Sequence, residues 1–138
     1  MFQTALALIQ NEAREYLLVR HAYDSRWYSA PGGGVEAGES PQTAVIRELR
    51  EELGVQIIVK YLVGMYEVDW GSRTTLVYLF ACEIVDGNIR INQPEEIESF
   101  AWFTPAQMPE HTNPLGRYLI EDVIGDSRGV TRSIKISD

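Results

Sequence analysis

Three glutamates in a short stretch of the sequence, Glu48, Glu51 and Glu52, have the spacing of a shared chemical site. On an α-helix each residue advances by about 100°, so these carboxylates fall within an arc of roughly 100°. Carboxylates this close together repel one another unless a cation lies among them. Hard divalent cations suit oxygen ligands, and Mg²⁺ also accepts phosphate oxygens. The spacing therefore predicts a site for Mg²⁺ or Mn²⁺ that leaves coordination positions open for a substrate.

An arginine and a further glutamate flank this group. Arg47 precedes Glu48 and lies one helical turn before Glu51, so it can orient a carboxylate without occupying the metal site. Glu39 can pair with Arg47 and fix the preceding loop against the helix. The glycine cluster Pro31–Gly34 lets backbone groups approach a metal or a phosphate, where side chains would obstruct them.

The cysteine and histidine content argues against zinc and against a thiol nucleophile. Cys82 is the only cysteine, and His21 and His111 are isolated in the sequence, so no zinc-ligand spacing exists. Cys82 lies in an apolar run and is expected to be a small buried hydrophobic residue. A lone cysteine also agrees with a reducing compartment.

The carboxylates require a helix to position them, and the sequence supplies its boundaries. Ser40 is a suitable N-cap, Pro41 suits the first helical position, and Gly54 ends the helix. The apolar residues occupy an arc to one side of the carboxylates and are expected to pack against the rest of the protein; they are Val45, Ile46, Leu49 and Leu53.

Strand patterns surround this helix. A polar connection at residues 11–14 predicts a hairpin between the first two strands, and a final helix is expected over residues 114–125. The expected strands cover residues 5–9, 16–20, 55–63, 74–84 and 100–103. Several strands with about two helices predict an α/β fold (α+β, mixed sheet) built in layers.

Length and charge limit the domain count and the partners. The 138 residues suit a single domain over residues 1–138, with a polar end over residues 126–138 that is loose or forms an edge strand. The net charge of −8 argues against polymeric nucleic acid as a partner. Uncharged runs are too short to span a membrane, and no secretory signal precedes the first strand. We therefore expect a cytoplasmic protein, monomeric or homodimeric.

The stretch from Gly33 to Val55 resembles the signature of the Nudix hydrolases, G-x5-E-x7-R-E-U-x-E-E-x-G-U, in which U is aliphatic. Every position of this Nudix box, residues 33–55, is met. The matching residues are Gly33, Glu39, Arg47, Glu48, Leu49, Glu51, Glu52, Gly54 and Val55.

The resemblance implies an α/β/α sandwich with a loop-helix-loop catalytic motif. It further implies hydrolysis of a nucleoside diphosphate linked to another moiety, with Mg²⁺ or Mn²⁺ as the cofactor and a metal-activated water attacking phosphorus. By this resemblance, Glu48, Glu51 and Glu52 are metal ligands, one glutamate of the site can act as the base, and the carbonyl of Gly32 joins the ligands. Two sets of residues complete the implied catalytic site: Glu39 and Arg47 as its supporting ion pair, and Glu96 as a further glutamate a few residues before Trp102.

Substrate identity is less determined by the sequence. Subfamily motifs of ADP-ribose, dinucleoside polyphosphate and coenzyme A hydrolases are missing, so a nucleoside triphosphate is the expected small-molecule substrate, as in nucleotide-sanitising members of the family. Hydrolysis of nucleotide sugars or of ADP-ribose-type compounds is the alternative. Asn113 either contacts a base edge or begins the last helix, and the second interpretation is favoured. Candidate base-stacking residues flank the box; they are Tyr23, Trp27, Tyr28, Tyr66 and Trp70.

Two other activities of Nudix domains are weighed against hydrolysis. A domain that senses a nucleotide without hydrolysing it commonly lacks box glutamates, whereas this sequence keeps them all. An isoprenoid diphosphate isomerase would need a cysteine ahead of the box, and none precedes Cys82. Hydrolysis is therefore the preferred prediction, and the sensing domain stays as an alternative.

Overall fold

The computed structural model describes residues 1–136 and contains two sheets and three helices in that range; residues 137 and 138, at the tip of the polar C-terminal end, lie outside it. The larger sheet has the strand order β4-β1-β6-β5-β8, and the smaller one has the order β3-β2-β7. The larger sheet comprises β1 (Phe2–Ile9), β4 (Gly32–Gly34), β5 (Gln56–Asp69), β6 (Thr74–Asp86) and β8 (Val130–Lys135). The smaller sheet comprises β2 (Tyr16–His21), β3 (Asp24–Ser29) and β7 (Ile97–Phe103). The helices are α1 (Pro41–Leu53), α2 (Met108–His111) and α3 (Pro114–Ile124).

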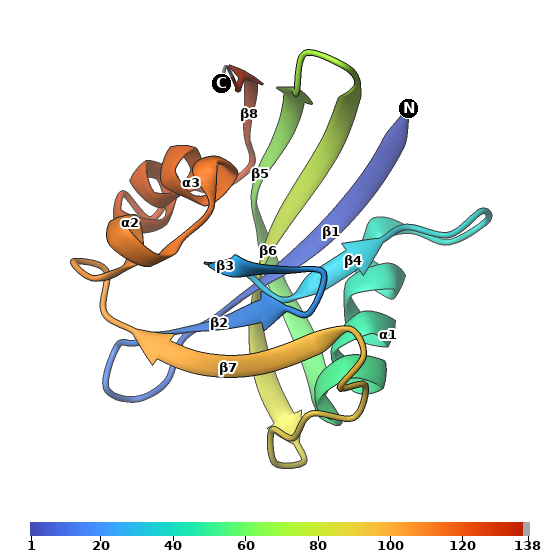
Figure 1. The fold of residues 1–138 in the computed structure, drawn as a ribbon, viewed down its shortest axis with the longest axis vertical. Coiled ribbons are helices and arrows are strands. Elements are labelled where there is room, and N and C mark those ends of the chain that lie inside the picture. The colour runs from blue at the N-terminus through green and yellow to red at the C-terminus, as the bar shows by residue number, and fades with distance from the viewer. Residues whose placement is uncertain (137–138) are drawn as a thin grey trace.

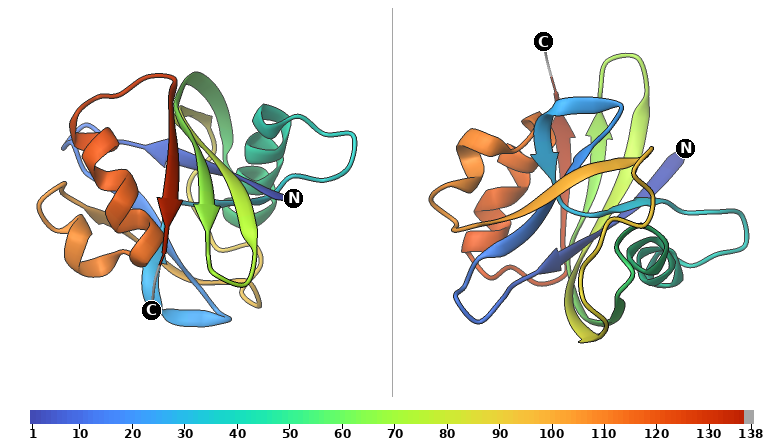
Figure 2. Two further views of the ribbon diagram at one scale, coloured as in Figure 1. Left: turned by 90° about the horizontal axis from the view of Figure 1, so that it is seen from above. Right: turned by 60° about the horizontal axis from the view of Figure 1, so that its bottom comes forward.

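The larger sheet separates two hydrophobic cores, as Figures 1 and 2 show with α1 on one side and α3 on the other. Successive residues of a strand point to opposite faces. Phe80 and Cys82 accordingly pack in the core with α1, and Leu79 and Ala81 in the core with α3. This layering confirms the mixed α/β sandwich that the sequence predicts.

Helix α1 has the predicted boundaries. The Ser40 hydroxyl accepts a hydrogen bond from the Thr43 amide at 3.1 Å, and Gly54 ends the helix in the left-handed conformation at φ 69°. Three apolar side chains of the predicted arc, Val45, Leu49 and Leu53, are fully buried. Burial of this face anchors the helix and leaves its carboxylate face free for the site.

The predicted hairpin between the first two strands is wrong in part. The turn forms, since the Asn11 amide donates to the Glu15 carbonyl at 2.9 Å and Gln10 bridges Tyr16. Beyond that bridge the strands diverge: β1 pairs with β4 and β6, whereas β2 pairs with β3 and β7. Strands β1 and β2 each form more backbone pairs with strands from elsewhere in the chain than with each other. These pairings are therefore favoured over an extended hairpin.

Two strands and one short helix were not expected from the sequence, namely β3, β4 and α2. Strand β4 lies within the glycine cluster, where a side chain at Gly32 would place its Cβ 2.1 Å from the Ala5 carbonyl oxygen of β1. Gly32 also has φ 144°, which favours glycine. The cluster therefore serves a close approach of two backbones, as well as leading to α1.

The polar end forms β8, which pairs in parallel with β5 at the edge of the larger sheet. This confirms the edge-strand alternative for the described part of residues 126–138. Cys82 is buried, as expected. Within residues 1–136, no helix has the length and apolar character that crossing a membrane requires.

Candidate active site

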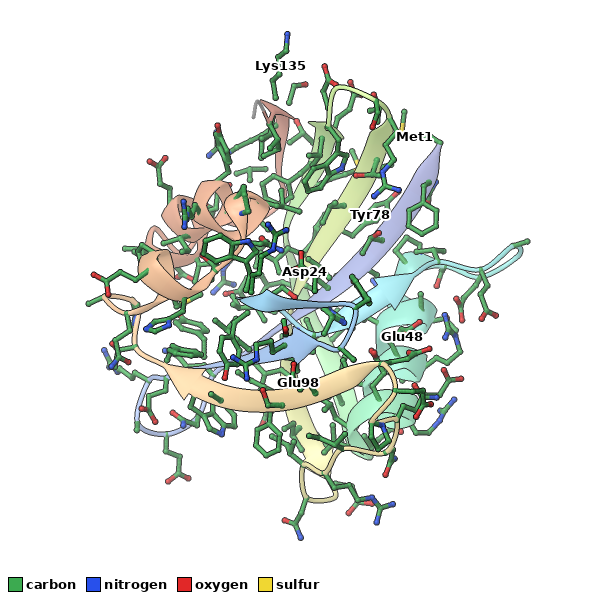
Figure 3. The ribbon with its side chains drawn as sticks, viewed as in Figure 1. Met1, Asp24, Glu48, Tyr78, Glu98 and Lys135 are labelled. Carbon is green, nitrogen blue, oxygen red and sulfur yellow. The ribbon has the colours of Figure 1, made fainter. Side chains whose placement is uncertain are left out.

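Helix α1 carries the three glutamates on one face but in three different environments. The Glu52 side chain is buried, with 4% of its surface exposed, whereas the Glu51 side chain is 44% exposed. The Glu48 side chain lies between these extremes, at 15% exposed. Figure 3 shows Glu48 on α1, beside strand β4. The three carboxylates of this face thus differ in exposure, from the buried Glu52 to the partly exposed Glu51.

Arg47 is the centre of the ion pairs at this site. Its Nε and Nη2 donate to the two carboxylate oxygens of Glu39 at 2.8 and 3.0 Å, and Nη2 also donates to the Gly34 carbonyl at 3.0 Å. Its Nη1 donates to Glu48 at 3.0 Å and to Glu51 at 3.2 Å. The guanidinium holds the pKa of Glu39 down, at about 2. The predicted pairing of Glu39 with Arg47 is confirmed, and it ties the loop before α1 to the helix.

Glu52 lacks such a partner. Its Oε1 is buried and accepts no hydrogen bond from the described residues. Burial, followed by a side-chain hydrogen bond with Glu48 and the charges of Glu48, Glu96 and Glu51, raises the pKa of Glu52 to about 9. A buried carboxyl without a donor is unfavourable, and native proteins keep such groups mainly at functional positions.

Gly33 provides room for the Glu48 carboxylate. A Cβ at Gly33 would lie 2.7 Å from Cδ of Glu48 and 2.8 Å from its Oε1. The glycine that begins the box therefore acts here through the space it leaves for an acidic side chain. The sequence suggested a different use, the access of backbone groups to a ligand.

The loop between β6 and β7 brings Glu96 toward the helix. The Asn92 amide donates to the Glu52 carbonyl at 3.0 Å, which holds this loop to the end of α1. Glu96 is exposed, and its charge contributes to the raised pKa of Glu52. Its carbonyl also accepts from the Ala22 amide at 2.8 Å, so the turn between β2 and β3 joins the same region.

That turn adds the ring of Tyr23, one of the candidate stacking residues, and the ring of His21, which the sequence does not place at the site. His21 and Tyr23 stack with their centroids 5.0 Å apart, and Tyr23 is 82% exposed. Partial desolvation, followed by the charges of Glu52, Asp24 and Glu96, raises the pKa of Tyr23. His21 was regarded as isolated because its neighbours in sequence carry no related chemistry. Only the pairing of β2 with β7 and the loop contacts reveal its position.

The donor chemistry of the site fits a divalent cation, although the side chains have not converged on one point. Within residues 1–136, no three acidic, histidine or cysteine side chains are grouped closely enough to hold a metal, and Arg47 contacts both Glu48 and Glu51 instead. The unpartnered Oε1 of Glu52 is the oxygen that most needs a cation. Oxygen donors of this kind match Mg²⁺ and Mn²⁺.

An apolar cavity of about 50 Å³ lies on the other side of the larger sheet, toward α3. Its lining includes Leu6, Leu18, Ser29, Thr112, Asn113 and Leu119. Asn113 is the N-cap of α3, where its Oδ1 accepts from the Gly116 amide at 2.7 Å, as favoured from the sequence. Its lining is mostly apolar, and its volume is well below the roughly 300 to 1,000 Å³ of typical small-molecule pockets.

The candidate stacking residues separate by burial. Tyr66 is fully buried and donates to Asp122, so it has no surface for a base. Trp70 donates to Thr75 at 2.9 Å, and Trp27 lies under Arg117 at 5.0 Å. Tyr23 alone of the five candidates has an exposed side chain near the carboxylates.

A sandwich of two sheets with a glutamate-bearing helix after a glycine loop defines the class of protein, and comparison with known proteins identifies the family. The model of the NUDIX domain matches residues 2–123. The chain belongs to the NUDIX domain family, and the predicted membership of the Nudix hydrolases is confirmed.

Relatives of known name differ in length from one another. NudC of Pseudomonas aeruginosa, a NAD-capped RNA hydrolase, is 33% identical over 109 residues, which cover 78% of this chain and 38% of NudC. The chain thus spans about two fifths of that relative. The 8-oxo-dGTP diphosphatase of Escherichia coli is 30% identical over 118 residues, covering 82% of this chain and 92% of the relative. A Nudix hydrolase structure from Nitrosomonas europaea superposes with a TM-score of 0.80 at 28% identity, covering 93% of this chain and 91% of that one.

Proposed function

We propose that this protein is a Mg²⁺- or Mn²⁺-dependent pyrophosphohydrolase that cleaves a nucleoside triphosphate, releasing pyrophosphate. The observation that carries the proposal is the buried carboxyl of Glu52, whose Oε1 has no hydrogen-bond partner among the described residues, within a complete set of box glutamates. Structural surface carboxylates are solvated or paired, whereas a polyanionic substrate in an acidic site requires cations held by carboxylates.

The proposed metal-holding groups are the carboxylates of Glu48, Glu51 and Glu52 with the carbonyl of Gly32. A bound divalent cation supplies charge neutralisation at the phosphate oxygens and lowers the pKa of a coordinated water. Arg47 keeps Glu48 and Glu51 oriented on the helix, and Glu39 anchors Arg47. These contacts hold the carboxylates before a substrate arrives.

Proton removal from the attacking water requires a base among the nearby glutamates. Glu96 is one candidate because it lies in the loop tied to the end of α1 and is exposed to solvent. The box glutamates that do not hold the cation are the others. Attack by a metal-activated water at phosphorus is the proposed reaction.

The choice of a nucleoside triphosphate rests on the relative of similar length. The Escherichia coli 8-oxo-dGTP diphosphatase is covered over 92% of its length, so the alignment includes nearly all of that protein. A small nucleotide also agrees with the net charge of −8.

NAD-capped RNA is the second candidate substrate, because several of the relatives are named for its hydrolysis. They share only the Nudix part with this chain, and the acidic charge disfavours an RNA body. Nucleotide sugars and ADP-ribose-type compounds remain the other small-molecule candidates. A sensing domain without hydrolysis is the proposal to be excluded first.

The test is a release assay over nucleoside triphosphates, 8-oxo-dGTP, nucleotide sugars, ADP-ribose and NAD-capped RNA, with products resolved by chromatography. We expect turnover with Mg²⁺ or Mn²⁺, none after EDTA, and recovery when the metal is restored. In ¹⁸O-water, the label should appear in a phosphate product. Full turnover without metal, or label only in a sugar product, contradicts the mechanism, and nucleotide binding without turnover supports the sensing domain.

A further inference from the structure

One row of residues crosses the smaller sheet and reaches the segment before α3. Ser99 of β7 pairs with Arg20 of β2, Arg20 pairs with Tyr28 of β3, and Tyr28 bridges Thr112. Three of these four side chains carry a buried polar atom with no hydrogen-bond partner among the described residues: Arg20 Nε, Ser99 Oγ and Thr112 Oγ1. Buried polar atoms are nearly always paired, so three in one row leave hydrogen-bonding groups open to water or to a ligand.

Arg20 differs from the other arginines whose Nε is engaged. The Nε groups of Arg26, Arg47 and Arg132 each donate to a carboxylate at 2.7 to 2.9 Å. The nearest acid to Arg20 is Glu98, whose Oε2 lies 3.8 Å from Nε, which is too long for a hydrogen bond. The guanidinium is instead held over the Tyr28 ring, at 5.3 Å from its centroid. It is therefore positioned but keeps an unused donor.

The row also lies between the two regions described above. Strand β2 continues from Arg20 into the turn whose Ala22 amide binds the Glu96 carbonyl, close to the carboxylates of α1. At the other end of the row, Thr112 lines the apolar cavity. A substrate that reaches from the carboxylates to this cavity would cross the row. The group suited to a guanidinium beside a serine hydroxyl is a phosphate, since both are donors and a guanidinium matches phosphate geometry.

We propose that Arg20 and Ser99 bind a phosphate group of the substrate, as a substrate-binding position built by the smaller sheet and separate from the carboxylates of α1. The proposal rests on the proposed function for the class of substrate, a phosphorylated nucleotide. The other guanidinium of the site, that of Arg47, is already bound to carboxylates. Arg20 therefore supplies the positive charge and the pair of parallel N–H donors that a phosphate needs. Thr112 at the end of the row leaves a hydroxyl for the nucleoside part.

The test compares Arg20→Gln with the parent in steady-state kinetics and in thermal unfolding. Loss of a hydrogen bond to a charged group should raise KM at least tenfold, with a smaller change in kcat and a retained thermal midpoint. The KM of Arg20→Lys should stay close to that of Arg20→Gln, because an ammonium lacks the two parallel N–H donors of a guanidinium. Arg26→Gln, an exposed arginine on the neighbouring strand, is the matched control and should behave as the parent. An unchanged KM in Arg20→Gln overturns the proposal, as does an equal rise in KM in Glu98→Gln, which would show that Arg20 acts through Glu98.

Two further measurements keep the proposal testable on its own. Ser99→Ala is a small change that should raise KM about threefold or more, even where Arg20→Gln fails to fold. Calorimetric binding of methylenediphosphonate with Mg²⁺ requires no turnover, and Arg20→Gln should weaken it at least tenfold. If the parent hydrolyses no compound of the panel, the proposed function fails, while binding of methylenediphosphonate that depends on Arg20 still supports the phosphate position. Absence of that binding in the parent, or equal binding in Arg20→Gln, overturns it.

Discussion

Two polar clusters lie on opposite sides of the larger sheet, and each contains a buried carboxyl group. The two carboxyl groups differ in the hydrogen bonds that they accept. Asp122 of α3 accepts four hydrogen bonds: two from Arg132 at 2.7 Å, one from Tyr66 at 2.9 Å and one from Ser127 at 3.2 Å. Glu52 of α1 is buried to a similar extent, yet one of its oxygens accepts none. Arg132 holds the pKa of Asp122 below its usual range, whereas burial raises the pKa of Glu52.

We interpret the difference as one between a carboxylate that stabilises the fold and one that we propose holds a cation. A satisfied buried carboxylate joins three elements, because Tyr66 lies on β5, Asp122 on α3 and Arg132 on β8. An unsatisfied one costs stability and is available for a cation. Replacing Glu52 with a neutral residue should therefore lower activity, whereas replacing Asp122 with one should lower stability.

The largest effect is expected for Glu52→Gln, and it should fall on activity. Since the pKa of Glu52 is about 9, the neutral amide resembles the protonated acid present at pH 7 in the metal-free protein. Folding should survive, while loss of a charged group at a metal-assisted site should lower kcat by at least about 10²-fold. Steady-state kinetics and the thermal midpoint measure the two effects.

Glu12→Gln is the control for this variant, because Glu12 is an exposed residue of the turn between β1 and β2. It should change neither kcat nor the thermal midpoint. Turnover close to the parent's in Glu52→Gln would remove the residue from the site, and a collapse of its thermal midpoint would assign it a structural role like that of Asp122.

Asp122→Ala should give the reverse result, a loss of stability with activity retained in the folded protein. Removing the buried carboxylate leaves Tyr66 and the half-exposed Arg132 without their acceptor, and we expect the free energy of unfolding to fall by about 1 to 3 kcal/mol. Urea unfolding measures this change. Glu121→Ala, at the exposed neighbouring position of α3, should cost much less. Equal losses in the two variants would contradict the role of the hydrogen-bond network.

The smallest effect concerns the pH dependence of stability. Because the pKa of Asp122 is lowered in the folded state, its contribution is present above the unfolded pKa of about 3.9 and is lost as the pH falls through the lower folded value. The difference in unfolding free energy between the parent and Asp122→Ala should be constant from about pH 5 to 7 and shrink below about pH 4. Titration of Glu39 contributes equally to the unfolding free energies of both proteins, so this contribution cancels in their difference. If the difference in unfolding free energy instead grows as the pH falls, the lowered pKa of Asp122 in the folded state is contradicted.

Local patterns predicted the helix of the site well. Capping by Ser40, the proline that follows it and the left-handed Gly54 are decided within a few residues, so α1 has its predicted bounds. The pairing of Glu39 with Arg47 could also be predicted, since one residue lies in the box loop and the other on the adjoining helix. Strand partners could not be predicted in this way, because they depend on residues far apart in the chain.

The sequence by itself determined the family, the acidic helix and the class of metal that its oxygens suit. Residue types and helical spacing are sufficient for these conclusions. Only the tertiary structure decided that Glu52 is buried without a donor, that Gly33 makes room for Glu48, and that Arg20 and Ser99 stand side by side on paired strands. Burial and strand register arise from contacts between distant segments, and these contacts set which polar atoms find partners and which are left for a ligand.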